Sequence, residues 1–150
     1  MKKNIVIVDI DGTLTLLGDR IKYLHQDKID WDNFFDACYE DEPIFEIIDL
    51  VQRLKYAKYD IIYMTGRRES IREKTLKWFK DKTSLNMKSS ELIMRKNDDY
   101  RHDIIIKPEM IKENNIDLKQ VAFVLEDRNS VVEMWRKLGV KCLQVADGDF

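Results

Sequence analysis

A short apolar run, Ile5-Val6-Ile7-Val8, is followed at once by two aspartates, and this order of residues limits the folds that the chain can adopt. A short β-branched run bounded by polar residues is typical of a buried strand. Asp9 and Asp11 come where that strand would end, and Gly12 permits the chain to turn there. In open α/β sheets, ligands bind at this end of the strands. The pattern therefore predicts a buried strand that carries two carboxylates at a binding edge.

Apolar runs and amphipathic segments alternate along the rest of the chain. Further strands are predicted at 61–64, 92–94, 121–125 and 142–145, and three amphipathic helices are predicted between them. The first helix is expected to begin at Pro43, and the last to end at Gly139. The apolar positions of the three helices are Ile44, Ile47, Ile48, Val51 and Leu54; Ile71, Leu76 and Phe79; and Val131, Val132, Trp135 and Leu138. Strands that alternate with helices favour a three-layer α/β fold with a mainly parallel sheet.

Length and charge narrow the organisation of the chain and its partners. A chain of 150 residues favours one domain, with a small cap or flap insert expected at about 15–42. The formal net charge of −2 gives no global basic field, so any contact with a polyanion would be local. Cys38 and Cys142 form no metal or redox motif, which favours free thiols in a reducing cytosol. The sequence has no long apolar span and no signal-peptide pattern, so we expect a cytoplasmic protein without membrane contact.

Polar motifs follow three of the predicted strands directly. These motifs are Asp9/Asp11, Thr65-Gly66-Arg67 and Glu126/Asp127. Because parallel strands end at one edge of a sheet, we expect the three motifs to converge there. One carboxylate of such a pair can attack a substrate while the other handles a proton, and together they offer oxygen ligands to Mg²⁺. Solvated turn aspartates and helix-capping acids are the alternative interpretations.

The four motifs Asp9-Ile10-Asp11-Gly12-Thr13, Thr65-Gly66, Lys107 and Glu126-Asp127 resemble, in order, those of the haloacid dehalogenase superfamily of phosphohydrolases. This resemblance implies a Rossmann-like fold. Segments 100–107, 126–140 and 144–150 resemble more closely the 3′-phosphatase domain of phage polynucleotide kinases. Such domains remove 3′-phosphates from nucleic acid ends with Mg²⁺ during repair.

The sequence departs from those enzymes at two points. It has no G-x-x-x-x-G-K-[ST] phosphate loop, so a kinase or ligase would be a separate partner. The last motif of the family usually begins with Asp, whereas this chain has Glu126.

The resemblance implies a role for each motif residue. Asp9 would be the nucleophile that forms an aspartyl-phosphate, and Asp11 would protonate the leaving oxygen and later deprotonate the attacking water. Mg²⁺ would bind Asp9, Asp127 and the backbone carbonyl of Asp11, and Glu126 would bind it directly or through water.

The phosphoryl oxygens have their own expected partners. Thr65 and the N–H of Gly66 would donate hydrogen bonds to them. Lys107 would add positive charge and keep Asp9 ionised, although spacing alone favours an exposed lysine before Pro108.

Further residues match substrate-binding positions of the phosphatase domain. Arg20 and Arg67 would contact the substrate, and Asp103 would orient Lys107 or an arginine; surface charge pairs are the alternative for all three. His25 and His102 are predicted to be non-catalytic. The aromatic residues Trp31, Phe34 and Phe35 either stack on a base or pack the insert onto the core.

The function that these expectations favour is Mg²⁺-dependent hydrolysis of phosphomonoesters, with 3′-phosphorylated DNA or RNA ends as substrate. A 5′(3′)-nucleotidase that acts on free mononucleotides would use the same chemistry. A receiver-like phospho-acceptor module is the alternative of another class, although its acceptor aspartate would follow a later strand. The sequence does not distinguish DNA from RNA, and it leaves the oligomeric state open.

Overall fold

A single five-stranded parallel sheet organises the chain in the computed structural model, which describes residues 2–150. The strands are β1 (Ile5–Val8), β2 (Asp60–Arg68), β3 (Leu92–Arg95), β4 (Val121–Glu126) and β5 (Cys142–Gln144). Their order in the sheet is β3-β2-β1-β4-β5, so the N-terminal strand is the central one. Val8, at the end of β1, pairs with Tyr63 of β2 and with Leu125 of β4. The predicted parallel sheet is thus confirmed.

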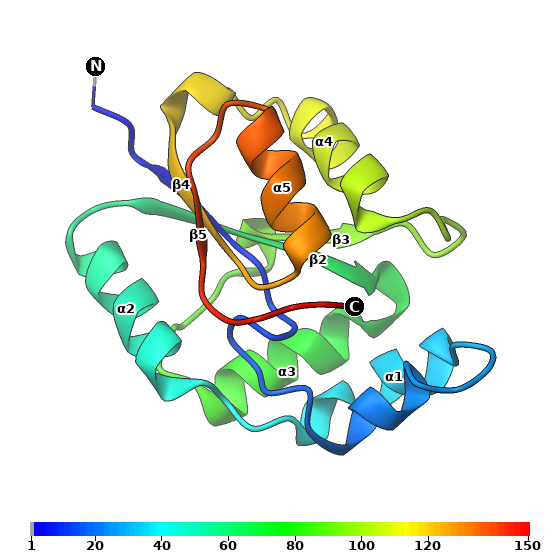
Figure 1. Cartoon of the computed structure of the whole chain (residues 1–150). Helices are drawn as coiled ribbons and strands as arrows, with labels where there is room; N and C mark the ends of the chain where they lie inside the picture. The colour runs from blue at the N-terminus through cyan, green and yellow to red at the C-terminus, as the bar shows by residue number, and fades with distance from the viewer. Residues whose placement is uncertain (1) are drawn as a thin grey trace.

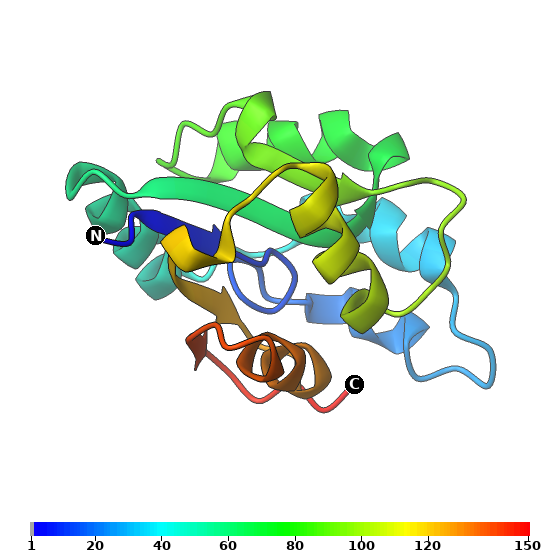
Figure 2. The same ribbon diagram turned by 90° about the horizontal axis from the view of Figure 1, so that it is seen from above.

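Helices cover both faces of the sheet, as Figures 1 and 2 show. They are α2 (Phe45–Tyr56) and α3 (Arg72–Lys82) on one face, and α4 (Asp103–Glu113) and α5 (Asn129–Lys137) on the other. Each face has its own apolar core, because β1 side chains alternate between the two: Val6 and Val8 lie in one core, and Ile7 in the other. Trp78 of α3 and Trp135 of α5 are fully buried in these two cores.

Some element boundaries differ from the sequence expectations. β2 continues through Thr65-Gly66-Arg67, which was expected to close the strand, and reaches Arg68 by pairing with β3. α2 begins at Phe45 instead of Pro43, because Pro43 forms an isolated bridge with Thr15. α3 begins just after Ile71, and β5 ends one residue earlier than expected. Gly139 lies just beyond α5 with a φ of +79°, as expected for a helix stop.

The segment between β1 and α2 forms a small insert of helical turns. It holds α1 (Trp31–Asp36), flanked by short 3₁₀ helices at Gly18–Tyr23 and Ala37–Glu40. A buried ion pair between Arg20 and Asp41 joins its two ends, and the indole N–H of Trp78 donates to the backbone oxygen of Asp41. The insert is therefore anchored to α3, and Figure 1 shows it beside the C-terminal ends of the strands.

Two observations concern the surroundings of the chain. Cys38 and Cys142 are both buried and form no disulfide. None of the helices in the described residues 2–150 is long and apolar enough to cross a membrane.

Candidate active site

The predicted motifs meet at the C-terminal edge of the sheet. Asp9 follows the last residue of β1, and its backbone N–H donates to the carbonyl of Leu125 in the adjacent β4 at 3.0 Å. Glu126 is the last residue of β4 and Asp127 follows it. One carboxylate oxygen of each of these three acids lies within 4.8 Å of the others, and all three residues are buried. The parallel topology therefore produces a buried acidic triad from segments far apart in sequence.

Lys107 enters this triad from α4. Its Nζ lies 2.8 Å from Asp9 Oδ1 and 2.8 Å from Glu126 Oε2, and only 1% of the residue is exposed. The expectation that a lysine before Pro108 is exposed is wrong, because Lys107 occupies the inward face of a helix that continues through this proline. Burial lowers the pKa of a lysine, but the carboxylates of Asp9 and Glu126 outweigh it and hold the Lys107 pKa above its usual range.

The triad carries more negative charge than Lys107 balances. Three carboxylates and one ammonium leave a net charge of −2 inside the protein. Burial, together with the charge of Glu126, raises the pKa of Asp9 above its ordinary range. The same two causes raise the pKa of Asp127 to about 7. A divalent cation would remove this excess, and carboxylate oxygens are the hard ligands that Mg²⁺ prefers. The residues present therefore fit a magnesium ion.

The two acids of the last motif have different partners. Glu126 Oε2 accepts from Lys107, and Glu126 Oε1 accepts from the backbone N–H groups of Asp127 and Arg128 at 3.1 and 3.2 Å. Asp127 Oδ1 accepts from the hydroxyl of Thr13 at 3.1 Å. Both oxygens of Glu126 thus accept hydrogen bonds from protein donors, whereas Asp127 Oδ2 accepts none from the described residues.

Gly12 makes room for Asp127. Its φ of +83° is strained for residues with a side chain, and a Cβ there would lie 2.1 Å from Asp127 Oδ2. The glycine of the first motif is therefore required both by the turn and by the carboxylate that approaches it.

Asp11 points into a separate, buried network of charges. Its carboxylate contacts Arg20 Nη2 and lies 2.6 Å from Arg67 Nη2. Asp41 in turn accepts hydrogen bonds from Arg20 Nε at 2.8 Å and Nη2 at 2.6 Å. Arg67 also donates to the Thr75 hydroxyl at 3.1 Å. Arg20 and Arg67 hold the pKa of Asp11 well below its usual range, so this carboxyl is ionised in the conformation observed.

The two arginines do not line the pocket. Arg67 is completely buried and Arg20 is 3% exposed, and each points its guanidinium at Asp11 from the protein side. The resemblance implies a role for them in substrate binding, whereas the structure places both guanidinium groups against Asp11, the acid–base candidate. That role in binding stays a prediction.

Thr65 and Gly66 lie at the pocket wall on β2. The Thr65 oxygen accepts from the backbone N–H of Arg67 at 3.1 Å, which leaves the hydroxyl proton free to donate. The carbonyl of Gly66 accepts from Arg95 Nε at 2.8 Å, and Arg95 also contacts Asp103. A Cβ at position 66 would lie 2.7 Å from an oxygen of Asp103. Asp103 therefore orients an arginine, one of its two predicted partners.

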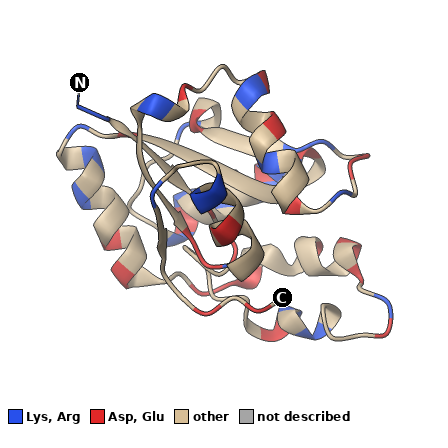
Figure 3. Cartoon of the chain, turned by 45° about the horizontal axis from the view of Figure 1, so that its top comes forward, with Lys and Arg blue, Asp and Glu red and all other residues tan. Residues whose placement is uncertain are grey.

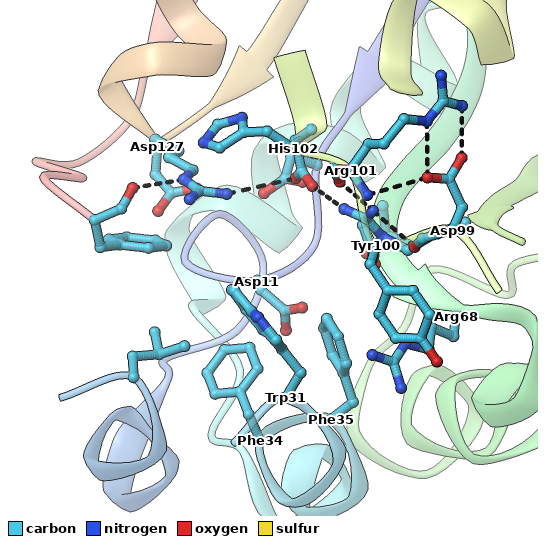
Figure 4. A pocket seen from close by; sticks show the side chains of 18 of the residues that line it. Asp11, Trp31, Phe34, Phe35, Arg68, Asp99, Tyr100, Arg101, His102 and Asp127 are labelled. Carbon is cyan, nitrogen blue, oxygen red and sulfur yellow. Dashed lines mark hydrogen bonds and ion pairs between the residues drawn. The ribbon is translucent and has the colours of Figure 1, made fainter. Parts of the chain in front are cut away.

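A pocket of about 200 Å³ opens in front of these groups. Figure 4 shows Asp11 and Asp127 within it, and the β3–α4 loop with Tyr100 and His102 at its border. The side chain of His102 accepts a hydrogen bond from the N–H of Ile104 at 3.2 Å, so it caps α4. The pocket is lined by Asp9, Asp11, Leu24, Trp31, Phe34, Phe35, Thr65, Gly66, Arg68, Arg95, Asp99, Tyr100, Arg101, His102, Asp103, Glu126, Asp127, Arg128 and Phe150.

Sequence reasoning missed three residues that hold this site together. Asp41 binds Arg20, Arg95 joins Gly66 to Asp103, and Thr13 bridges toward Asp9 and Asp127. Thr13 belongs to the first motif and could have been singled out there. Asp41 and Arg95 carry no local signal, because their partners are distant in sequence.

One family of known proteins matches nearly the whole chain. A sequence model of the polynucleotide kinase phosphatase domain family covers residues 3–150. The chain belongs to this family. It is therefore a phosphatase domain of the haloacid dehalogenase type, as the motifs around Asp9, Lys107 and Asp127 predicted.

Individual relatives agree with this assignment. A protein of Autographa californica nuclear polyhedrosis virus, named as a bifunctional polynucleotide kinase/RNA ligase, is 30% identical over 136 residues, which are 90% of this chain and 18% of that protein. Chains from two structures of the Pnkp1/Rnl/Hen1 complex, one described as an RNA repair complex, are 34% and 35% identical, with TM-scores of 0.77 and 0.80. They cover 97% and 99% of this chain, which spans 43% and 48% of them.

A more distant structure shares the fold alone. The class C acid phosphatase from Bacillus anthracis with tungstate bound has a TM-score of 0.62 at 15% identity, and the match covers 98% of this chain and 68% of that one. The viral relative and the two chains of the Pnkp1/Rnl/Hen1 complex, in contrast, are much longer than this chain, which spans less than half of each.

Proposed function

We propose that this phosphatase domain removes 3′-phosphates from nucleic acid ends by a two-step reaction that depends on Mg²⁺. The observation that carries the proposal is the buried triad of Asp9, Glu126 and Asp127 around Lys107, at the edge of a pocket, in a chain of this family. Carboxylates in such a cluster can attack phosphorus and bind a metal. An acid that only caps a helix would not need to lie beside two other buried acids and a lysine.

Asp9 is the nucleophile in the first step. An oxygen of its carboxylate forms a bond to phosphorus while the bond between phosphorus and the 3′-oxygen breaks, which gives an aspartyl-phosphate and a 3′-hydroxyl end. Lys107, 2.8 Å from Asp9 Oδ1, favours the charged form of Asp9 against burial and Glu126, which raise its pKa, and a bound Mg²⁺ would favour that form further. Thr65 and the N–H of Gly66 stabilise the phosphoryl oxygens, since both residues line the pocket.

Asp11 transfers the protons. The 3′-oxygen needs a proton as it leaves, and a carboxylate bound by Arg20 and Arg67 is a poor donor. Asp11 must therefore swing away from these arginines and take up a proton before it acts as the acid. In the second step water attacks phosphorus, the bond to Asp9 breaks, and Asp11 accepts the proton of the water as inorganic phosphate forms.

The metal would be held by Asp9 and Asp127, and Glu126 would position Lys107. The free oxygen of Asp127 and the engaged oxygens of Glu126 support this division. When bound, Mg²⁺ supplies positive charge that lets an anionic phosphate approach the anionic Asp9.

The choice of a strand end over a small metabolite rests on the pocket and on the relatives. The insert is small, and the pocket is open to one side, so a polymer end can enter. The relatives carry polynucleotide kinase or RNA repair in their names. We propose that a kinase and a ligase, on other chains or other domains, process the ends that this domain dephosphorylates.

The test is phosphate release from matched oligonucleotides that carry one phosphate at either the 3′ or the 5′ end. Free 3′- and 5′-mononucleotides and an aryl phosphate are measured beside them, each as DNA and RNA where both exist. We expect the highest kcat/KM with the 3′-phosphorylated strand, and no turnover by Asp9→Asn with any substrate. Equal or better use of the 5′-mononucleotide would move this protein to the nucleotidases. Stable phosphorylation of Asp9 without turnover would instead indicate a phospho-acceptor module.

A further inference from the structure

The pocket that holds the acids has a second wall, built from aromatic side chains of α1. Trp31, Phe34 and Phe35 line the same pocket as the acids. In Figure 4 their rings lie across the pocket from Asp127, with Asp11 between. We call these three side chains the aromatic wall. The mechanism proposed above uses none of them.

The two phenylalanines fix the tryptophan in place. The rings of Trp31 and Phe35 are stacked, with centroids 5.8 Å apart and planes at 20°, and Phe34 meets Trp31 edge-on at 5.8 Å. Phe34 and Phe35 are only 4% and 8% exposed, whereas Trp31 is half-buried. Trp31 therefore presents a pre-positioned flat surface to whatever enters the pocket.

The border of the pocket near this wall also consists of flat groups. Tyr100 of the β3–α4 loop is 73% exposed, and the guanidinium of Arg68 lies 4.8 Å from the centroid of its ring. The same guanidinium lies 5.9 Å from the centroid of Phe35. Figure 4 shows Arg68 and Tyr100 beside the wall. A planar ligand could thus find π surfaces on two sides.

Two arginines at this border are paired with carboxylates. Arg101 pairs with Asp99 at 2.7 Å and with Glu109 at 2.6 Å, and Arg68 pairs with Asp32 at 2.5 Å. The aromatic wall is the apolar part of the lining that a nucleotide base would meet.

We propose that the aromatic wall binds the base of the terminal nucleotide by stacking on Trp31 while the 3′-phosphate of that nucleotide reaches Asp9. This inference rests on the proposed function, because it names the part of the strand that the site recognises. Every nucleobase has a π-face, so stacking accepts all sequences, as removal of phosphates from strand ends requires. A sugar phosphate without a base offers no flat face and would leave the wall in contact with water.

The kinetic test compares two short single strands that differ only at the 3′-terminal residue. Both carry a 3′-phosphate, but one ends in an ordinary nucleotide and the other in an abasic tetrahydrofuran residue. We expect wild-type kcat/KM to be about tenfold higher for the strand with the base. Trp31→Leu keeps apolar bulk for packing on Phe34 and Phe35. It should lower kcat/KM for the strand with the base to the value for the abasic strand, and it should leave kcat/KM for the abasic strand unchanged. Trp31→Phe should restore most of the difference.

A binding test uses the fluorescence of the protein. The other tryptophans, Trp78 and Trp135, are fully buried in the two cores, so Trp31 is the tryptophan that a ligand can reach. In the inactive Asp9→Asn variant, the strand with the base should quench this fluorescence, and the abasic strand should not. The same variant with Trp31→Phe added should show no quenching.

The outcomes separate this inference from the proposed function. Tyr56→Ala, which removes a 76%-exposed ring on α2, is the control for loss of an aromatic group and should change neither strand. Equal slowing of both strands by Trp31→Leu, or equal wild-type rates on both, would overturn the stacking. If the wild type hydrolyses an aryl phosphate but neither strand, the proposed function fails. The fluorescence test then decides the stacking by itself: quenching by the strand with the base, and none by the abasic strand, would still support it.

Discussion

At the scale of single residues, Glu126 and Asp127 have different surroundings although they are neighbours in sequence. Glu126 accepts hydrogen bonds from Lys107 and from two backbone N–H groups, whereas the carboxylate of Asp127 accepts one only from Thr13 among the described residues. The longer side chain at position 126 reaches Lys107, and in the proposed mechanism the metal is held by Asp127 instead. The glutamate that departs from the family pattern is therefore compatible with the same chemistry.

We predict that Asp127→Asn and Glu126→Gln have opposite signatures. Asp127→Asn should raise the Mg²⁺ concentration for half-maximal activity by at least tenfold, because it removes a metal ligand. Glu126→Gln should leave that concentration within about twofold, but it should lower the free energy of unfolding by about 2 kcal/mol, because Lys107 loses a charged hydrogen bond. Mg²⁺ titrations and urea unfolding measure the two effects. A larger Mg²⁺ shift in Glu126→Gln would show that the wrong acid was assigned to the metal.

A second prediction concerns Arg67. Its guanidinium contacts Asp11 and Thr75 inside the protein, so Arg67→Lys keeps the charge but loses the fork that holds Asp11. We expect kcat/KM to fall by a similar factor, about tenfold, for an aryl phosphate and for a 3′-phosphorylated oligonucleotide. Thermal melting of the wild type and of Arg67→Lys checks that both proteins are folded under the assay conditions. A loss confined to the oligonucleotide would place Arg67 on the substrate, as the sequence resemblance implies.

At the scale of elements, apolar periodicity predicted the five strands and the helices α2, α3 and α5, because it reports burial directly. It did not predict α4, the helix that carries Lys107. It failed where pairing partners lie elsewhere in the chain. Thr65-Gly66-Arg67 has the composition of a loop, yet it continues β2, since Thr65 pairs with Met94 of β3. Pro108 favoured an exposed lysine before it, yet both residues lie inside α4 and Lys107 is buried. In both cases tertiary contacts override local preference.

The candidate site could be predicted to a similar degree. Asp9, Thr65 and Asp127 converge because parallel strands end at one edge, which the order of strands and helices already implied. The contacts of Arg20 and Arg67 with the carboxylate of Asp11 could not be predicted. Nothing in the sequence around Asp41 links it to Arg20, which lies 21 residues away.

The turn after β1 gives a third prediction. In Gly12→Ala the new methyl group would collide with Asp127, so we expect the Mg²⁺ concentration for half-maximal activity to rise. The free energy of unfolding should fall by more than the cost of about 1–2 kcal/mol for placing alanine in a left-handed backbone conformation. Gly18→Ala is the matched control, because Gly18 also has a positive φ, +53°, but nothing lies within 4 Å of its Cβ position. Gly18→Ala should lose about 1 kcal/mol in urea unfolding and keep its Mg²⁺ requirement. Identical Mg²⁺ titrations for the two variants would contradict the close approach of Asp127.

At the scale of the whole molecule, charges of both signs are spread over the chain. Figure 3 shows Lys and Arg mixed with Asp and Glu along the ribbon, in keeping with a formal net charge of −2. With this net charge, the chain offers a long nucleic acid no overall positive field. Only the last one or two nucleotides of a strand should be held.

The fourth prediction follows from this distribution of charge. If one or two phosphates are bound, kcat/KM for a 3′-phosphorylated oligonucleotide should fall by less than about tenfold between 50 and 200 mM NaCl. The aryl phosphate, measured under the same conditions, corrects for effects of salt on the chemical steps. A corrected loss of about a thousandfold would reveal a long backbone contact that the ribbon does not indicate.

The central position of β1 has a consequence for how the chain is made. Of the five strands, β1 is the first to be synthesised, and both of its neighbours, β2 and β4, come later in the chain. During translation, the backbone N–H and C=O groups on both edges of this β-branched strand therefore stay unpaired until β2 and β4 have been synthesised. Such an edge can pair with another nascent chain before β4 emerges. Chaperone co-expression or slower initiation of translation should therefore raise the yield of folded protein in a production host.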